Sequence, residues 1–426
     1  MLGETIIVFG LLCLLMILGI PIAVSLGMTG IITLVAFGNV ESLQMFPQRL
    51  FVGCDSFALL AIPFFMVAGE LMLQGGISKR LVNMAKCFLY GLRGSLALIG
   101  FVASAFFGAL SGSAMATTAA IGKIMYPEML KDGTYDKNFA LAVQAVGGTL
   151  GPMIPPSITL IVFGTLANAS IGDMMIGTLI PGLIACLIYC LTGYIIIRRE
   201  GMATNQVKPE KGILASFLDG FWALITPLII LGGIYTGVFS PTESAAAACL
   251  YALIIGWLVY KELNLKAIYQ ALLNAFLSMS SIMFLIACAT FFGWVLTMEG
   301  IPQYITSALM DTVTNKYVLL LMINLVFLFL GCFVDVITII LLAVPLVVPV
   351  VLHLGIDPVH FGVITNIVTG IGLITPPFGA CLFVASGLDK SVKIEYIYKR
   401  IIPFCITATI GGFIVTYVPI LSLWFK

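Results

Sequence analysis

The stretch Gly151-Pro-Met-Ile-Pro-Pro-Ser157 decides the fold, because it interrupts an apolar run from residue 138 to residue 167 that is long enough to cross a bilayer. Two adjacent prolines remove two backbone donors and clash with the preceding turn, so the helix must break there. At membrane depth, carbonyls without partners are tolerated only inside protein or along a polar cavity, where they can bind a small cation. The same pattern returns at Gly372-Leu-Ile-Thr-Pro-Pro-Phe-Gly379.

The composition predicts an all-α integral membrane protein that is embedded in a lipid bilayer. Hydrophobic residues make up 61% of the 426 residues and charged residues 9%, whereas soluble domains carry about 25% charged residues. The net charge of +1 suggests no nucleic-acid partner. The chain lacks a Walker A motif, so we expect no use of ATP. Met1 to Glu4 lacks a basic segment, so we expect the first apolar run to be a retained span rather than a cleaved signal.

Two further apolar runs predict re-entrant hairpins, because the two flanks of each run are alike. Residues 95–122 have Lys and Arg on both sides, including Arg93 and Lys123, and cytoplasmic loops collect such residues. The tip of this hairpin would be Ser111-Gly-Ser113, although an ordinary single span is the alternative. Residues 317–352 have flanks that are not basic, so a second hairpin with its tip near Asp335 would open to the outside.

The resulting map has about ten full crossings, two hairpins and both termini outside. We divide it into N-terminal scaffold helices, a first repeat, a linker with central scaffold helices, and a second repeat. Their ranges are 1–56, 57–199, 200–266 and 267–426. The first repeat contains hairpin 95–122 and broken helix 138–167, and the second contains hairpin 317–352 and broken helix 358–388.

The two halves repeat each other at a nearly fixed offset. Gly108 and Gly331 are 223 residues apart, and the two Pro-Pro pairs are 221 apart. Each unit crosses the membrane three times and two spans connect the units, so the second copy would be inverted. Inverted repeats with broken helices that meet at the midplane are typical of secondary transporters.

Each hairpin tip should face the break of its own repeat, where hydroxyls and free carbonyls offer the hard oxygen ligands that alkali cations prefer. We therefore expect one cation at each of two sites. The first would use Ser111, Ala114, Gly151, Ile154 and Pro156, and the second Val334, Ile337, Thr369, Gly372, Thr375 and Pro377. The alternative is that the prolines only kink helices and the small residues only pack.

Two acidic residues stand out in the apolar runs. Asp335 could contact a substrate, relay a proton or neutralise a cation, or it could make only a structural hydrogen bond within the tip. Glu70, near the end of the third span, could pair with Arg80 or Lys79.

Several stretches together resemble the large membrane subunit of tripartite ATP-independent periplasmic (TRAP) transporters, within the ion transporter superfamily. The motifs that carry this resemblance lie between Ser56 and Gly379: SFALLAIPFFMVAGELM, GALSGSAMAT, GPMIPPS, FSPTESAAAA and DPVHFGVITNIVTGIGLITPPFG. The resemblance implies sodium-driven uptake (two or more ions) of an acidic solute such as a sialic acid or C4-dicarboxylate. It also implies an elevator-type movement of a transport domain against a scaffold.

The resemblance further implies partners and a location. The partners would be a small four-helix membrane subunit on a separate chain and a soluble periplasmic substrate-binding protein, and the location the bacterial inner membrane with periplasmic termini. Substrate contact by Ser113, Thr159 and Asp335 is a hypothesis from their expected position between the two cation sites. The alternative is a self-sufficient carrier of citrate or another anion. We do not expect an enzyme, because no His or Asp pair has metal-ligand spacing.

Overall fold

The computed structural model describes residues 2–89, 91–92, 94–131, 133, 135–202, 212–312 and 315–426, and these form helices without strands. Arg93 and most of the expected linker, residues 203–211, lie outside the described residues. Within the described chain, seven helices are long and apolar enough to cross a membrane, or eight if one bent pair counts as a span. The chain is therefore a multi-pass membrane protein, while the figure of ten crossings stays a prediction.

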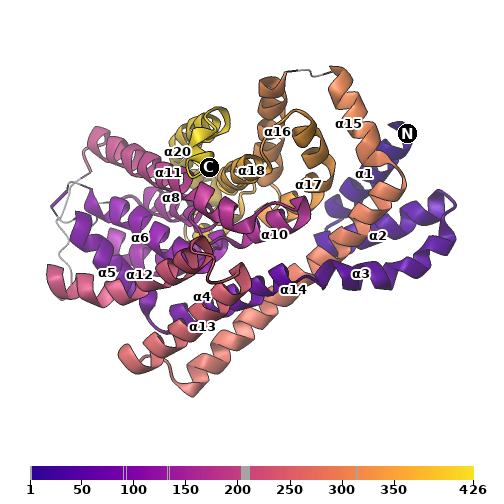
Figure 1. The fold of residues 1–426 in the computed structure, drawn as a ribbon. Coiled ribbons are helices and arrows are strands. Elements are labelled where there is room, and N and C mark those ends of the chain that lie inside the picture. The colour runs from indigo at the N-terminus through magenta and orange to yellow at the C-terminus, as the bar shows by residue number, and fades with distance from the viewer. Residues whose placement is uncertain are drawn as a thin grey trace.

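The N-terminal helices lie at one end of the molecule (Figure 1). They are α1 (Leu2–Ile17), α2 (Ile22–Ala36), η1 (Val40–Met45) and α3 (Phe46–Cys54). Helices α2 and α3 pack on α14 (Leu265–Met298), which is 34 residues long. At 1.5 Å per residue, α14 is about 50 Å long and extends past a hydrocarbon core of about 30 Å.

The two repeats have the same order of elements, joined by α12 (Ile213–Tyr235), α13 (Pro241–Ile254) and η3 (Ile255–Val259). The first comprises η2 (Phe57–Leu60), α4 (Ala61–Gln74), α5 (Ile77–Leu89), α6 (Ser95–Ser111), α7 (Ala114–Leu130), α8 (Lys137–Gly148), α9 (Leu150–Met153), α10 (Ile158–Ala167) and α11 (Ile171–Arg199). The second comprises α14, α15 (Ile301–Thr312), α16 (Lys316–Gly331), α17 (Val336–His353), α18 (Pro358–Gly372), α19 (Ala380–Ser386) and α20 (Ile394–Tyr417), and α21 (Ile420–Leu423) follows.

Both predicted breaks are present. The chain bends by 41° between Lys137–Met153 and Ile158–Ala167, and α18 ends at Gly372 before α19 begins at Ala380. Both Pro-Pro bonds are cis, a second feature that the repeats share.

The helices found in the two runs that were predicted as hairpins match the predicted bounds to different degrees. The boundary at residue 122 is wrong, because α7 continues to Leu130. Lys123 is exposed on that helix, while Ile121, Met125 and Met129 extend its buried face. The second run, residues 317–352, is covered by α16 and α17 to within a residue at each end, while its re-entrant course stays a prediction.

The packing between the repeats is reciprocal. Helix α10 packs on α17 and its counterpart α19 packs on α7, while α11 packs on α18 and its counterpart α20 packs on α8. The pair α11 and α20 also pack on each other. Reciprocal contacts of this kind are the signature of a two-fold relation between similar units. The repeats therefore enclose a common centre.

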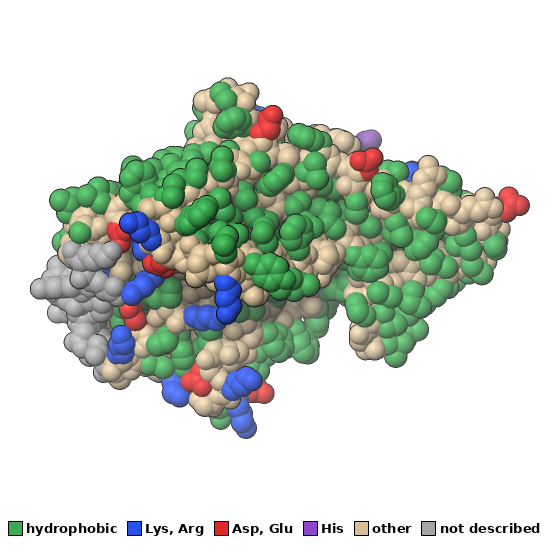
Figure 2. All heavy atoms as spheres, turned by 90° about the horizontal axis from the view of Figure 1, so that it is seen from below, with side chains coloured by type: hydrophobic (Ala, Val, Ile, Leu, Met, Phe, Trp, Pro, Cys, Tyr) green, Lys and Arg blue, Asp and Glu red, His purple; other side chains and the backbone are tan. Residues whose placement is uncertain are grey.

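The outer surface is strongly apolar. Figure 2 shows hydrophobic side chains over most of one face, with Lys and Arg gathered toward one end. Helix α11 presents an exposed stripe at every fourth residue, and its counterpart α20 does the same; the stripes are Leu183, Leu187, Leu191 and Ile195, and Ile402, Ile406, Ile410 and Ile414. Such surfaces are stable in contact with lipid or another apolar partner.

Candidate substrate and cation site

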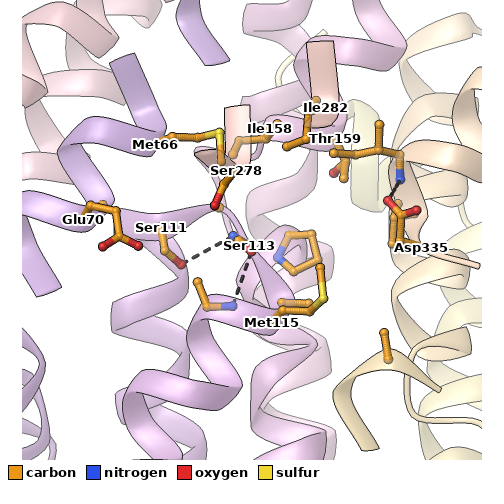
Figure 3. Close-up of a pocket in the computed structure, with 18 of the residues that line it drawn as sticks. Met66, Glu70, Ser111, Ser113, Met115, Ile158, Thr159, Ser278, Ile282 and Asp335 are labelled. Atoms are coloured by element: carbon orange, nitrogen blue, oxygen red, sulfur yellow. Dashed lines mark hydrogen bonds between the residues drawn. The ribbon is translucent and has the colours of Figure 1, made fainter. Parts of the chain in front are cut away.

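A cavity of about 520 Å³ lies where the two tips and the two breaks converge. Its wall includes residues from both hairpin tips, from the first residues of α10 and from each break, and α4 and α14 complete it. Figure 3 shows Glu70 and Asp335 on opposite sides of this cavity, with Ser113 between them. The lining residues that bear polar side chains are Glu70, Ser111, Ser113, Thr159, Ser278, Ser281 and Asp335.

The first tip lies directly against the first break, through glycines that leave no room for a side chain. A Cβ on Gly151 would lie 2.4 Å from the Ser113 carbonyl oxygen, and one on Gly108 would lie 3.0 Å from the Gly151 Cα. Gly112 has φ +60° and approaches the Pro156 carbonyl, to which a Cβ would be 3.0 Å. Backbone atoms of the tip and the break are therefore neighbours.

The second tip meets the second break in the same way. A Cβ on Gly372 would lie 2.6 Å from the Gly331 Cα, and one on Gly331 would lie 3.2 Å from the Thr369 carbonyl oxygen. Gly331 and Gly372 occupy the positions of Gly108 and Gly151 in the repeat. The close contact between tip and break is thus a property of the repeated unit.

Hydrogen bonds at the first tip leave Ser111 as an acceptor. Thr117 donates its hydroxyl proton to the Ser113 carbonyl at 2.7 Å, so the 3.0 Å contact between Ser111 and Thr117 requires Ser111 to be the donor. With its proton committed, Ser111 Oγ presents only lone pairs, one of which accepts from the Ser113 N–H at 3.4 Å, and it is buried beside the cavity. A hydroxyl in this state suits a cation.

The hydroxyls of the second break are committed in the same manner. Thr369 donates to the Thr365 carbonyl at 2.5 Å, and Thr375 donates to the Ile371 carbonyl at 3.1 Å. The Pro377 carbonyl is less well suited to a cation than expected, because it accepts a hydrogen bond from the Tyr398 hydroxyl at 2.6 Å.

Asp335 and Ser113 hold equivalent positions as N-caps of the returning helices. Ser113 accepts from the Ala116 N–H at the start of α7, and Asp335 accepts from the Ile337 N–H at 3.1 Å at the start of α17 and from the Thr338 hydroxyl. Asp335 therefore makes structural hydrogen bonds within the tip, which was the alternative to a functional role. Asp335 also lines the cavity, so the cap and a ligand contact can coexist.

Asn366 is a residue that sequence reasoning missed. It lies in the unbroken part of α18, fully buried, and donates from Nδ2 to the Pro152 carbonyl at 2.7 Å. Its Oδ1 accepts from Thr159 at 2.5 Å, so the Thr159 oxygen accepts from the Ser157 hydroxyl at 2.7 Å and can act toward a ligand only as an acceptor. The only signal in the sequence was a lone amide within an apolar helix.

Some of the predicted site residues line the cavity and others lie beside it. Ser111, Ser113, Ala114, Thr159, Asp335 and Ile337 line it. The other predicted residues lie in the tips and breaks next to it, where Pro152 and Leu373 line the wall instead: Gly151, Ile154, Pro156, Val334, Thr369, Gly372, Thr375 and Pro377. The described residues contain no group of three His, Cys, Asp or Glu side chains arranged to hold a metal.

The predicted partner of Glu70 was wrong with respect to Arg80. Arg80 pairs with Glu262 at 2.7 Å and with Asp219 at 3.4 Å. Glu70 instead faces the cavity and accepts from Asn274 Nδ2 at 3.2 Å.

Fold and cavity together define a membrane protein of two reciprocally packed repeats that enclose a central cavity, whose largely apolar wall carries two carboxylates and five hydroxyls. Residues 9–421 match the family model described as the tripartite ATP-independent periplasmic transporter, DctM component. The chain therefore belongs to this family, the large permease subunits of TRAP transporters.

Comparisons with individual proteins agree with this assignment. The chain is 39% identical to an isethionate TRAP transporter permease protein, DctMQ, of Oleidesulfovibrio alaskensis, over 98% of this chain and 66% of that protein. It is 37% identical to the sialic acid TRAP transporter large permease protein SiaM of Vibrio cholerae, over 89% and 88%. The YdaH transporter of Alcanivorax borkumensis shares the fold, with a TM-score of 0.67 over 90% of this chain and 89% of that one, at 15% identity.

Proposed function

We propose that this chain is the translocating subunit of a sodium-coupled carrier that imports an acidic organic solute. The observation that carries the proposal is the state of the hydroxyls around the cavity. Ser111, Thr369 and Thr375 each donate within the protein, so toward a ligand their oxygens can act only as acceptors. Oxygens of this kind stabilise a dehydrated alkali cation. The described lining residues include no Lys, Arg or His, so none of them supplies the positive charge that such a cation would bring.

Two sodium ions would bind at the two tip–break contacts. The first site would use Ser111 with backbone oxygens at Ala114, Gly151, Ile154 and Pro156, and the second Thr369 and Thr375 with Val334, Ile337, Gly372 and Pro377. Ser113, Thr159 and Asp335 lie between these positions and line the cavity, so they would contact the solute. A sodium ion supplies positive charge beside a solute carboxylate, which the lining itself does not provide.

An elevator movement is the mechanism that we propose for crossing the membrane. The hairpins and broken helices would move together, because Asn366 and the reciprocal helix contacts join them. The frame would comprise α1 to α4 and α12 to α14, in which α4 packs on α13 and α14 and α14 packs on α2 and α3. In the ranges proposed from the sequence, this frame is supplied by residues 1–56 and 200–266 and by the first long helix of each repeat. The second repeat would be inverted relative to the first in the bacterial inner membrane, with both termini periplasmic.

A complete transporter would need two further components. We propose a small membrane subunit with four helices as a separate chain and a periplasmic binding protein that delivers the solute. The tripartite description of the family supports this, and the longer relative is named DctMQ. Sialic acid and C4-dicarboxylate permeases among the relatives support an acidic solute.

Uptake into proteoliposomes tests the proposal. Vesicles that hold this chain with both partners should accumulate the solute when sodium is outside, and should stop when potassium replaces sodium. Uptake that is indifferent to this exchange would contradict sodium coupling. Full uptake by the chain without partners would show a self-sufficient carrier instead.

A further inference from the structure

Helix α4 contributes to the cavity wall a carboxylate, Glu70, that is not among the residues proposed above to bind sodium or the solute. Glu70 lies on the face of α4 that also carries Met66, Gly69 and Leu73, and all four line the cavity. These positions recur at helical spacing, so one face of α4 forms a wall of the site. That wall touches the first tip, because a Cβ on Gly69 would lie 3.5 Å from the Ser111 Cα.

A hydrogen-bond relay fixes Glu70 as an acceptor. Gln270 Nε2 donates to Asn274 Oδ1 at 2.9 Å, and Asn274 Nδ2 donates to Glu70 Oε2 at 3.2 Å. The first bond fixes the orientation of the Asn274 amide, so its N–H side must face the carboxylate. Among the residues that the structure describes, Glu70 Oε1 has no hydrogen-bond partner and remains available to a ligand.

The opposite wall is acceptor-rich as well. Asp335 faces Glu70 across the cavity (Figure 3), and Thr159 has its proton committed to Asn366. None of the described lining residues is Lys, Arg or His. A solute with two carboxylates and no hydroxyl group would bring acceptors to acceptors, whereas a solute with several hydroxyls could donate to both walls.

We propose that Glu70 is a specificity-determining residue that contacts the solute and selects hydroxylated monocarboxylic acids over plain dicarboxylic acids. The proposal rests on the function proposed above. The hydroxyls of the solute donate to Glu70 Oε1 and to Asp335, and its single carboxylate is the only acceptor group that the sodium ions must balance. The apolar side chains Met66, Phe107 and Ile282 would cover the carbon face of such a solute.

Two four-carbon acids form a matched pair of ligands. L-threonate has three hydroxyls and one carboxylate, and succinate has two carboxylates and no hydroxyl. The purified full chain is melted in sodium chloride with increasing amounts of either acid, because a ligand that binds the folded state raises the melting temperature with its occupancy. We expect the apparent affinity for threonate to be at least tenfold higher than that for succinate.

Glu70→Gln tests the residue itself. It keeps the shape, lets Asn274 donate to the amide oxygen and points an amide N–H at the cavity instead of a carboxylate oxygen. Threonate affinity should fall about tenfold or more and the preference over succinate should disappear, with Glu70→Asp intermediate. Glu41→Gln, at an exposed position on η1, should behave as wild type.

The outcomes separate this inference from the proposed function. If sodium stabilises the protein but threonate and succinate bind equally, or neither binds, the inference fails and sodium coupling stands. An unchanged preference in Glu70→Gln also overturns it, and the sodium-dependent rise in melting temperature of that variant shows whether it is folded. If sodium has no effect relative to potassium, it is the proposed function that fails.

Discussion

Gly151→Ala should disable the first cation site, because it adds one methyl group at the point where the first tip meets the first break. The new Cβ would lie 2.4 Å from the Ser113 carbonyl oxygen and 2.9 Å from the Ala114 nitrogen. Both are backbone atoms that cannot rotate away, so the tip must shift. Overpacking of this kind costs about 1–3 kcal/mol. If that cost falls on the cation-bound arrangement, sodium affinity decreases about 5- to 150-fold, since 1.4 kcal/mol is about tenfold.

The assay is a sodium titration of solute uptake, with sodium-dependent thermal stabilisation of the purified chain as a second readout. Gly10→Ala is the matched control, because nothing lies within 4 Å of a Cβ at that position of α1. It should leave sodium affinity unchanged and stabilise the helix by about 0.5–1 kcal/mol. Gly372→Ala should weaken the second site by the same reasoning. A folded Gly151→Ala protein with wild-type sodium affinity would refute the idea that tip and break form the site together.

Three further changes follow from individual contacts. Ser111→Ala removes an oxygen that presents only lone pairs, so the sodium concentration that gives half-maximal uptake should rise about tenfold. An unchanged concentration would show that Ser111 is not a sodium ligand. Asn366→Leu leaves the buried Pro152 carbonyl without its hydrogen-bond donor, at about 1–3 kcal/mol, and removes one acceptor of the Thr159 hydroxyl, which keeps its contact with Ser157. The variant should have a lower melting temperature and lower uptake, whereas the exposed control Asn264→Leu on the α14 cap should affect only stability. The pKa of the Asp389 carboxylate is held well below its usual value by Ser391, then by Tyr126 and Lys137; because the folded-state pKa is the lower one, this stabilisation is present at neutral pH and lost as the pH falls below about 4. The melting temperature of the wild type should therefore fall more steeply in acid than that of Asp389→Asn, and parallel curves would contradict this role.

The backbone features of the site were predictable from sequence because they depend on local chemistry. Paired prolines break a helix wherever they occur, and the recurrence of Gly108 and Gly331 at one offset fixed the correspondence between the halves. Ser111, Ser113 and Asp335 could be placed at the tips for the same reason, since a tip is defined by small and capping residues.

The interactions that could not be predicted from the sequence join residues that are far apart along the chain. Asn366 bonds to a carbonyl 214 positions away, and Glu70 meets Asn274 across 204 positions. Nearness in sequence predicted Arg80 or Lys79 as the partner of Glu70, but Arg80 pairs with Glu262 and Asp219 and lies over the ring of Tyr260.

The amide at Asn366 has no twin in the other repeat. The position 221 residues earlier, at the offset that relates Gly151 to Gly372, is Ala145, whose side chain makes no hydrogen bond. The first break is thus held by a hydrogen bond from the other repeat, whereas the second break has no equivalent bond from an amide at the corresponding position. The two proposed sodium sites would then differ in affinity although the repeats are similar. We expect the first site to fill before the second, as two resolved steps in a sodium binding isotherm. A single step in which two sodium ions bind with equal affinity would mean that the hydrogen bond from Asn366 to Pro152 does not affect sodium binding.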